Sequence, residues 1–127
     1  SCRAGTRTTY YSGELDKDLD RVAWHIFNAK NTSHQVGQKE PNACGLYDMN
    51  GNVWEWCQDW YEEKYYARSP AEDPQGSAQG ADRVLRGGSW GFNPRYCRSA
   101  DRSWHNPGIR ESCTGFRVVV VPASRTP

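Results

Sequence analysis

Cysteine and histidine are the side chains in this sequence that could ligate a metal ion or act as nucleophiles. The cysteines are Cys2, Cys44, Cys57, Cys97 and Cys113, and the histidines are His25, His34 and His105. Structural zinc sites use closely spaced pairs of such ligands, and no two of these cysteines form a Cys-x-x-Cys pair. The spacing therefore argues against zinc and favours buried or surface thiols with room for one disulfide. At least one thiol stays unpaired within the chain, because the number is odd.

The segment 91–114 fits neither the period of a strand nor that of a helix. Its large rings alternate with serine, glycine, asparagine and arginine. This mixture is typical of antibody-combining sites, where tyrosine and tryptophan give contact area and small polar residues adapt to the partner. An ordinary long loop is the alternative. We predict that the ligand-binding residues are Gly91, Phe92, Asn93, Tyr96, Asp101, Ser103, Trp104, His105, Asn106, Ile109, Glu111, Ser112 and Cys113; they are called the predicted face below.

Length, charge and hydropathy exclude several classes of protein. Residues 1–127 have the length of a single domain. Sixteen basic and fifteen acidic residues leave a net charge of +1 and no basic tract, which argues against a nucleic-acid partner. The longest apolar run covers residues 118–121 and is too short for a membrane span. Sixteen aromatic residues (six Trp, seven Tyr and three Phe) against one Met predict a core built from large rings.

Four segments carry patterns of secondary structure. A helical spacing of Leu15, Leu19, Val22, Ala23 and Ile26 predicts a short helix there. Residues 53–61 are rich in strand-forming rings and give the strongest strand prediction. Residues 83–86 and 116–121 are predicted as further strands, and the Pro- and Gly-rich residues 65–82, which precede the first of them, as a surface loop.

Three motifs follow one another along the chain. They read PNACGLYDMNGNVWEW at residues 41–56, RVLRGGSW at 83–90 and GFRVV at 115–119. Together with CRAGT at residues 2–6, they resemble the formylglycine-generating-enzyme (sulfatase-modifying factor) family over nearly the whole chain. The resemblance implies an α+β, C-type-lectin-like fold of the formylglycine-generating-enzyme type, which is loop-rich with short antiparallel strands.

The enzymes of this family resemble copper oxidases that hold the metal between two cysteines shortly after the Gly-Gly-Ser-aromatic motif. Two thiolates suit Cu(I). Counted from Ser89 and Trp90, the second cysteine falls on Cys97, but the first position holds Phe92. The resemblance therefore implies a non-enzymatic relative without a catalytic cofactor. A copper-dependent oxidase acting on protein cysteine is the alternative.

Variable proteins of diversity-generating retroelements form a second branch that this chain resembles. They share the fold, and adenine-directed mutagenesis diversifies positions near their C-terminal end. The fixed positions of that segment match Arg98, Ser99, Ala100, Arg102, Pro107, Arg110 and residues 115–117. Most positions of the predicted face can be reached from an asparagine codon by changing its adenines, whereas Trp104 and Glu111 need another template codon. The resemblance implies a receptor-recognition domain of phage or bacteria, on a virion or cell surface, with a protein or carbohydrate ligand.

The family's enzyme also holds a structural calcium ion, at positions that match Asp48, Gly51, Val53 and Glu55. Two carboxylates and two backbone carbonyls are suitable hard oxygen ligands. In the alternative interpretation, Asp48 caps the turn and Glu55 pairs with an arginine.

The motifs divide the aromatic and basic side chains by role. We predict that the rings Trp54, Trp56, Trp60, Trp90 and Phe116 belong to the scaffold, whereas Phe92, Tyr96 and Trp104 contact the ligand. The guanidinium groups of Arg83, Arg86, Arg98, Arg102 and Arg117 are expected to brace loops by stacking on rings and donating to carbonyls. The sequence as a whole predicts a ligand-binding domain, with a purely structural module as a further alternative.

Overall fold

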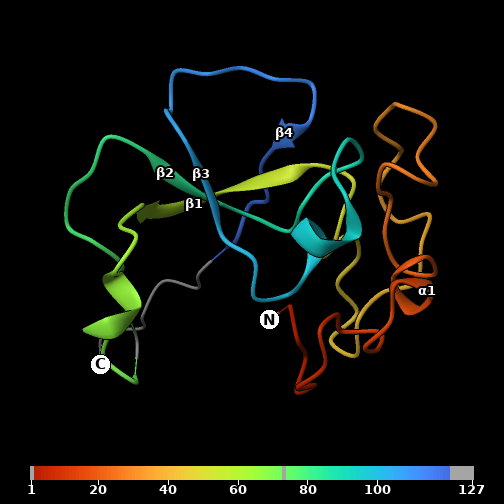
Figure 1. Ribbon diagram of the computed structural model, residues 1–127, viewed down its shortest axis with the longest axis horizontal. Coiled ribbons are helices and arrows are strands. Elements are labelled where there is room, and N and C mark those ends of the chain that lie inside the picture. Colours follow the sequence, from red (N-terminus) through yellow and green to blue (C-terminus); the bar gives the residue numbers. More distant parts are fainter. Residues whose placement is uncertain (1, 73, 121–127) are drawn as a thin grey trace.

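Four short strands form one sheet in the computed structural model, which describes residues 2–72 and 74–120 (Figure 1). The strands are β1 (Trp54–Trp60), β2 (Arg83–Arg86), β3 (Ser103–His105) and β4 (Thr114–Gly115). Their order in the sheet is β3-β2-β1-β4. β1 and β2 confirm two of the predicted strands. β3 lies within a segment whose sequence predicted only irregular structure.

The directions of the strands differ in one respect from the expected antiparallel arrangement. β1 pairs antiparallel with β2, and β2 pairs antiparallel with β3. β4 instead runs parallel to β1, with Trp54 opposite Thr114 and Glu55 opposite Gly115. A parallel neighbour needs a long connection. The loop that leaves β3 and arches over the sheet into β4 supplies it (Figure 1).

The central strands are covered on both sides. Val84 and Leu85 are neighbours on β2, so their side chains point to opposite faces of the sheet. Both are buried, as is Trp54 at the start of β1. Because burial at 84 and 85 does not alternate, β2 cannot have one solvent-facing side, and loops must pack against both faces of the sheet.

The strand predicted at 116–121 is wrong over its described residues. Residues 116–120 pair with no strand in the described part of the chain, and Val121 lies outside it. Phe116, Val118, Val119 and Val120 are 77–88% exposed, so Phe116 is not the scaffold ring that the motif predicted. Strand propensity reflects packing against neighbours, and here no described neighbour lies alongside.

The helix predicted around Leu15–Ile26 is also shorter than expected. α1 covers only Asp16–Leu19, and the other helical pieces are the 3-10 turns η1 (Tyr65–Ala67) and η2 (Pro94–Cys97). Beyond α1, Asn28 accepts a hydrogen bond from the backbone N–H of His25 (2.8 Å), and Asp20 binds the His25 ring (2.7 Å). Such side-chain bonds compete with helix continuation. No helix of the described residues is long and apolar enough to cross a membrane.

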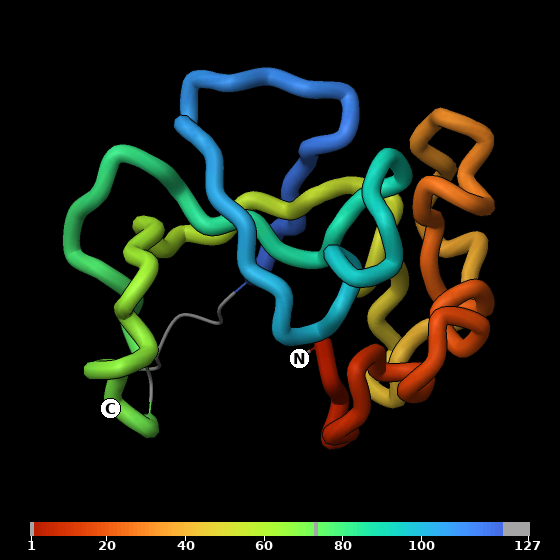
Figure 2. The backbone as a smooth tube through the Cα atoms, viewed as in Figure 1, coloured from red at the N-terminus to blue at the C-terminus, as the bar shows by residue number. Residues whose placement is uncertain are grey.

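Two rings rather than many form the centre of the core. The chain before β1 gathers in irregular loops on one side of the sheet (Figure 2). The buried cluster on this side comprises Tyr10, Tyr11, Leu19, Val22 and Ala23 from these loops and Cys97 from η2. Of the tryptophans predicted as scaffold, Trp54 is buried, but Trp56, Trp60 and Trp90 are half-buried. The prediction of a ring-built core therefore holds only in part.

Buried asparagines hold the loops together. Asn50 is fully buried and donates to the carbonyl of Cys97 (2.7 Å). Asn52 accepts from the N–H of His34 (2.9 Å) and donates to the carbonyl of the same residue (3.1 Å). Buried backbone groups need partners wherever no helix or strand supplies them. These amide side chains thus satisfy backbone groups that strand pairing would satisfy in a sheet.

Two leucines at opposite ends of α1 test the placement of the core. Leu19 is fully buried, whereas Leu15 is 56% exposed. We expect Leu19→Ala to lower the free energy of unfolding by about 2–5 kcal/mol, because it leaves a cavity. The matched control Leu15→Ala should change it by less than about 1 kcal/mol. Urea unfolding followed by tryptophan fluorescence measures both, and equal losses would contradict this core.

Candidate functional site

Two tryptophans join the separate parts of the predicted face. The N–H of Trp54 donates to the carbonyl of Cys113 (2.7 Å), and the indole N–H of Trp90 donates to the carbonyl of Ser112 (3.4 Å). The Phe92 ring stands edge-on against Trp54, with centroids 5.5 Å apart. Residues around 92 and around 112 are thereby brought together, although twenty positions separate them in sequence.

The loop entering η2 carries the first group of predicted ligand contacts. Asn93 caps this turn by accepting from the N–H of Arg95 (3.4 Å). Tyr96 packs edge-on against Phe92, with centroids 5.8 Å apart, and the guanidinium of Arg95 lies over the Tyr96 ring. Gly91 has open space where a side chain would begin. Phe92 therefore leans on fixed neighbours while 37% of its surface stays exposed.

Trp104 on β3 is the most exposed ring of the predicted face. It is 51% exposed and stacks on Tyr61, with centroids 4.4 Å apart and planes 24° apart. The guanidinium of Arg102 lies over both Tyr61 and Tyr66. The stack holds the indole in one orientation, so it can offer its surface to a partner at little cost in side-chain entropy.

The loop between β3 and β4 contributes polar side chains that bind one another. Glu111 accepts from the Cys113 thiol (3.6 Å) and lies 3.3 Å from His105 Nε2. Asn106 accepts from the N–H of Gly108 (2.9 Å) and so closes a turn. Ile109 at the tip of this turn is exposed. The hollow beside Ile109 and Glu111 has about 170 Å³, less than a typical small-molecule site of roughly 300–1,000 Å³.

One residue of the predicted face is turned away from the others. The Asp101 side chain is only 12% exposed and pairs with Arg98 (3.0 Å). Burial nevertheless raises the pKa of this carboxyl, with Arg98 opposing the rise. Arg86 donates to the Asp101 carbonyl (2.6 Å). Asp101 therefore braces the loop, and Ser103 is half-buried within β3.

Two exposed apolar residues beside the predicted face were missed. The N–H of Ile26 donates to the carbonyl of Phe92 (3.1 Å), which places the backbone of Ile26 beside that residue of the face. Ile26 and Phe27 are both exposed, and Phe27 rests edge-on against the buried ring of His25. The sequence had counted Ile26 only in the spacing of the predicted helix. The one sequence feature that could have indicated an exposed apolar site here was Phe27, a large ring that falls outside the helical spacing.

Of the two cysteine positions in the copper pair of the family's enzymes, this chain fills the one at Cys97. Cys97 is fully buried, and burial raises the pKa of its thiol to about 12. Phe92 occupies the other position of the enzyme's pair. All five cysteines are free, and no cluster of three potential metal-ligating His, Cys, Asp or Glu side chains exists among the described residues. Cys97 therefore lacks the second thiol that the copper pair of the family's enzymes needs.

The turn predicted to hold calcium has one carboxylate that suits a cation and another that an arginine already binds. Asp48 accepts from the N–H of Gly37 (2.8 Å) through one oxygen, while its other carboxylate oxygen is buried without a partner. Both oxygens of Glu55 are bound by Arg117 (3.0 and 2.5 Å), which also donates to the carbonyl of Tyr47 (2.9 Å). The orphaned oxygen of Asp48 fits a cation. The geometry of Glu55 matches the alternative of an arginine pair.

The five arginines predicted to brace loops make such contacts. The Arg83 guanidinium lies 3.6 Å from the centre of the Trp60 ring, and Arg102 donates to the carbonyl of Glu62. Arg86, Arg98 and Arg117 bind the partners already described. The hydrogen bonds to Glu55 raise the pKa of Arg117 further, so this group stays charged.

The chain matches the family described as "Sulfatase-modifying factor enzyme 1-like domain" over residues 1–122. It belongs to this family. Among curated relatives of the sulfatase-modifying factor domain, it is 46% identical over 104 residues to the serine/threonine-protein kinase pkn1 of Chlamydia pneumoniae, covering 80% of this chain and 16% of that protein. It is 50% identical over 85 residues to the formylglycine-generating enzyme of Streptomyces coelicolor, covering 65% and 27%.

Solved structures confirm the fold class of this sulfatase-modifying factor domain. Treponema denticola variable protein 1 superposes with a TM-score of 0.81 at 37% identity, covering 91% of this chain and 41% of that one. The C-type-lectin-like fold of the formylglycine-generating-enzyme type is therefore confirmed, and so is the likeness to variable proteins. The chain spans well under half the length of each of these relatives.

Thiol labelling tests the burial of Cys97. Because desolvation holds its pKa near 12, the thiolate is scarce at about pH 8, and the backbone also blocks access. We expect Ellman's reagent to modify the exposed Cys44 in the folded domain and to leave Cys97 unmodified until denaturant is added. Cys44→Ser serves as the control for the fast phase. Labelling of Cys97 at a rate close to that of Cys44 would contradict the structure.

Proposed function

We propose that this domain is a non-enzymatic ligand-binding domain whose contact surface is the predicted face, with Asp101 in a supporting role. The observation that carries the proposal is the joining of residues 92 and 112 by Trp54 and Trp90, while Phe92, Trp104 and Ile109 stay exposed. A binding surface whose side chains vary needs a constant scaffold that holds it. Here Trp54 and Trp90 form that scaffold, while the rings of the predicted face stay exposed to a partner.

The shape of the surface favours a macromolecular ligand. Small-molecule sites are usually concave and enclose most of the ligand. The hollow beside Ile109 and Glu111 of this face has only about 170 Å³, and none of the rings Phe92, Tyr96 and Trp104 lines it. Tryptophan and tyrosine held by neighbouring rings suit a protein surface, where aromatic anchors contribute most of the affinity. We propose a protein on a cell surface as the partner, and a carbohydrate as the other outcome of a ligand screen.

Diversification of the face by a retroelement is part of the proposal. The likeness to a protein named as a variable protein supports it. A template copy of this segment beside a reverse-transcriptase gene, differing only at adenines, is the expected genomic finding. Without such a copy, the diversification part fails while ligand binding can still be assayed.

A paired library tests whether the face and the scaffold are separable. One library randomises Phe92, Trp104 and Ile109, and the other randomises Trp54, Trp90 and Val84. Buried side chains cost several kcal/mol when lost, whereas exposed ones cost little. We expect protease-resistant members to be at least about tenfold more frequent in the first library, measured by phage display with proteolysis. Equal frequencies would contradict the proposal.

The oxidase alternative has a direct assay. Copper-treated domain is incubated with a cysteine-containing peptide, and mass spectrometry follows the peptide. With Cys97 buried and Phe92 at the other position, we expect no conversion of cysteine to formylglycine. Turnover that depends on Cys97 would overturn the non-enzymatic assignment.

We propose structural calcium at the 48–55 turn, supported by the orphaned oxygen of Asp48. Asp48 and Glu55 would supply carboxylates and Gly51 and Val53 carbonyls, and the ion would pin the turn to β1. All four residues line one pocket of about 350 Å³. Arg117 competes for Glu55, so the affinity should be modest.

Thermal unfolding tests this calcium proposal. A ligand that binds only the folded state raises Tm. We expect about 5 mM calcium to raise Tm by roughly 5 °C and Asp48→Asn to abolish the rise. Asp59→Asn, which alters an exposed carboxylate on β1, should leave the rise intact. If the wild type shows no rise, Arg117 alone satisfies the turn and the calcium proposal is wrong.

A further inference from the structure

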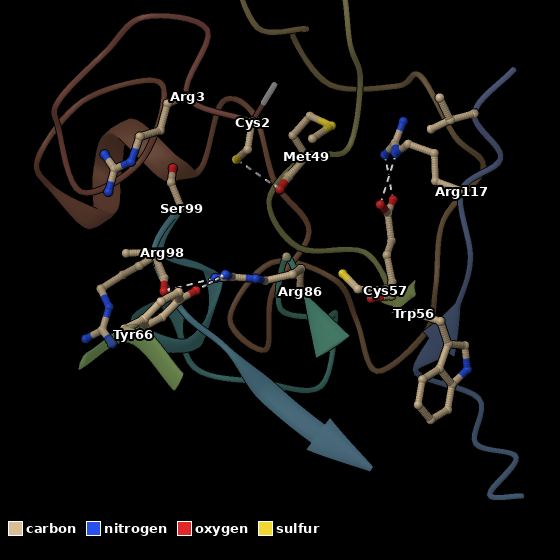
Figure 3. A pocket seen from close by; sticks show the side chains of 14 residues that line it. Cys2, Arg3, Met49, Trp56, Cys57, Tyr66, Arg86, Arg98, Ser99 and Arg117 are labelled. Carbon is tan, nitrogen blue, oxygen red and sulfur yellow. Dashed lines mark hydrogen bonds and ion pairs between the residues drawn. The ribbon is translucent and has the colours of Figure 1, made fainter. Parts of the chain in front are cut away.

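A pocket of about 650 Å³ lies apart from the predicted face (Figure 3). Its walls come from the N-terminal residues Cys2 and Arg3, from β1 and β2, and from the segment 98–100. None of the thirteen residues of the predicted face lines it. Its volume falls within the usual range of small-molecule sites, roughly 300–1,000 Å³. We call it the arginine pocket.

Four arginine residues and a single acidic residue line this pocket. The arginines are Arg3, Arg86, Arg98 and Arg117, the acidic residue is Glu55, and the Arg98 guanidinium is turned away from the pocket in Figure 3. Arg117 binds both Glu55 oxygens, so this acid is already neutralised within the wall. Figure 3 shows the pair on one side of the pocket and Arg86 reaching along another side toward Tyr66.

Two of the four charges form no ion pair among the described residues. Arg98 pairs with Asp101, which lies outside the pocket lining. Arg3 donates to the carbonyl of Thr8 (2.5 Å). Arg86 donates to the carbonyls of Ala100 (3.1 Å) and Asp101 (2.6 Å) and to the Tyr66 hydroxyl (2.5 Å). These contacts are to neutral oxygens and are not ion pairs, although the carboxylates of Asp101 and Glu14 lie near enough to interact with the charges of Arg86 and Arg3.

The remaining walls are apolar or neutral. Met49, Trp56 and Val119 supply apolar surface. Burial raises the pKa of the Cys57 thiol, which therefore stays neutral in the pocket. A ligand that suits these walls carries one anionic group for the guanidiniums and an apolar body for the side chains beside them.

We propose that the arginine pocket binds an organic carboxylate with an apolar body. Planar guanidinium groups recognise carboxylates through paired, charge-assisted hydrogen bonds. Arg3 and Arg86 take the carboxylate, and Met49, Trp56 and Val119 pack on the apolar part. This second site is independent of the ligand-binding face, so the two sites can be tested separately.

Naphthoate is a suitable probe, because it combines one carboxylate with a rigid apolar body. We expect saturable binding to the wild-type chain with a Kd of about 1 mM, as for a fragment of this size. Chemical shifts in a heteronuclear NMR titration should change at Met49, Cys57 and Ser99 and stay constant at Trp104 and Ile109. Failure to saturate below about 10 mM, or shifts confined to other surfaces, would overturn the proposal.

Two further compounds separate charge from apolar contact. Naphthamide has the same shape without the charge, and we expect it to bind at least about tenfold more weakly. Inorganic phosphate has the charge without the apolar body and should also bind about tenfold more weakly. Equal binding of the amide would refute the role of the arginines, and equal binding of phosphate would refute the role of the apolar walls.

Matched variants assign the effect to the pocket. Arg3→Gln should weaken naphthoate binding at least about fivefold. Arg7→Gln removes the same charge four residues away, from an exposed side chain outside the pocket, and should leave Kd unchanged. Arg86→Gln is expected to have a larger effect, provided that its thermal unfolding shows a folded domain. Unchanged binding by Arg3→Gln would contradict the proposal even if Arg86→Gln does not fold.

Discussion

Buried backbone groups that lie outside helices and strands need side-chain partners, and the rest of this domain depends on that requirement. Asn50 reaches the carbonyl of Cys97 from inside the core, and Asn52 binds both backbone groups of His34. Each link connects segments that are far apart in the sequence. The few hydrogen bonds of a short sheet could not hold so much irregular chain, so removal of one amide would leave buried groups unpaired at high cost.

The same links explain why exposed rings can coexist with an ordered scaffold. The carbonyl of Asn52 accepts from the N–H of Trp90. Trp54, two residues after Asn52 in the sequence, starts β1. Those two tryptophans form hydrogen bonds to the backbone at residues 112 and 113, and Trp54 also packs against the Phe92 ring. Contacts to backbone do not depend on residue type. The side chains of the face can therefore vary without loss of the links that position them.

The motifs predicted the scaffold better than periodicity did. Residues 54–60 and 83–86 form strands as expected, because ring-rich and aliphatic neighbours there pair with each other. The valines at 118–120 carry the same local signal, yet no described strand pairs with them, and pairing is a property of the fold rather than of the segment. Leu19 and Ile26 share a helical period, but Asp20 and Asn28 turn the chain between them. The joining of residues 92 and 112 depends on backbone contacts, which no side-chain pattern encodes.

Arginine side chains also hold the loops together, by donating hydrogen bonds to their carbonyls and carboxylates. Each such contact places a positive charge in the loop region. Arg117 meets Glu55 and Arg98 meets Asp101, so these charges are compensated where they stand. Arg3 and Arg86 bind only neutral oxygens among the described residues, and they line the same cavity. A net charge of +1 thus conceals a local separation of charge. The electropositive pocket follows from the way in which a loop-rich chain satisfies its carbonyls, because a guanidinium that serves a carbonyl still requires an anion nearby.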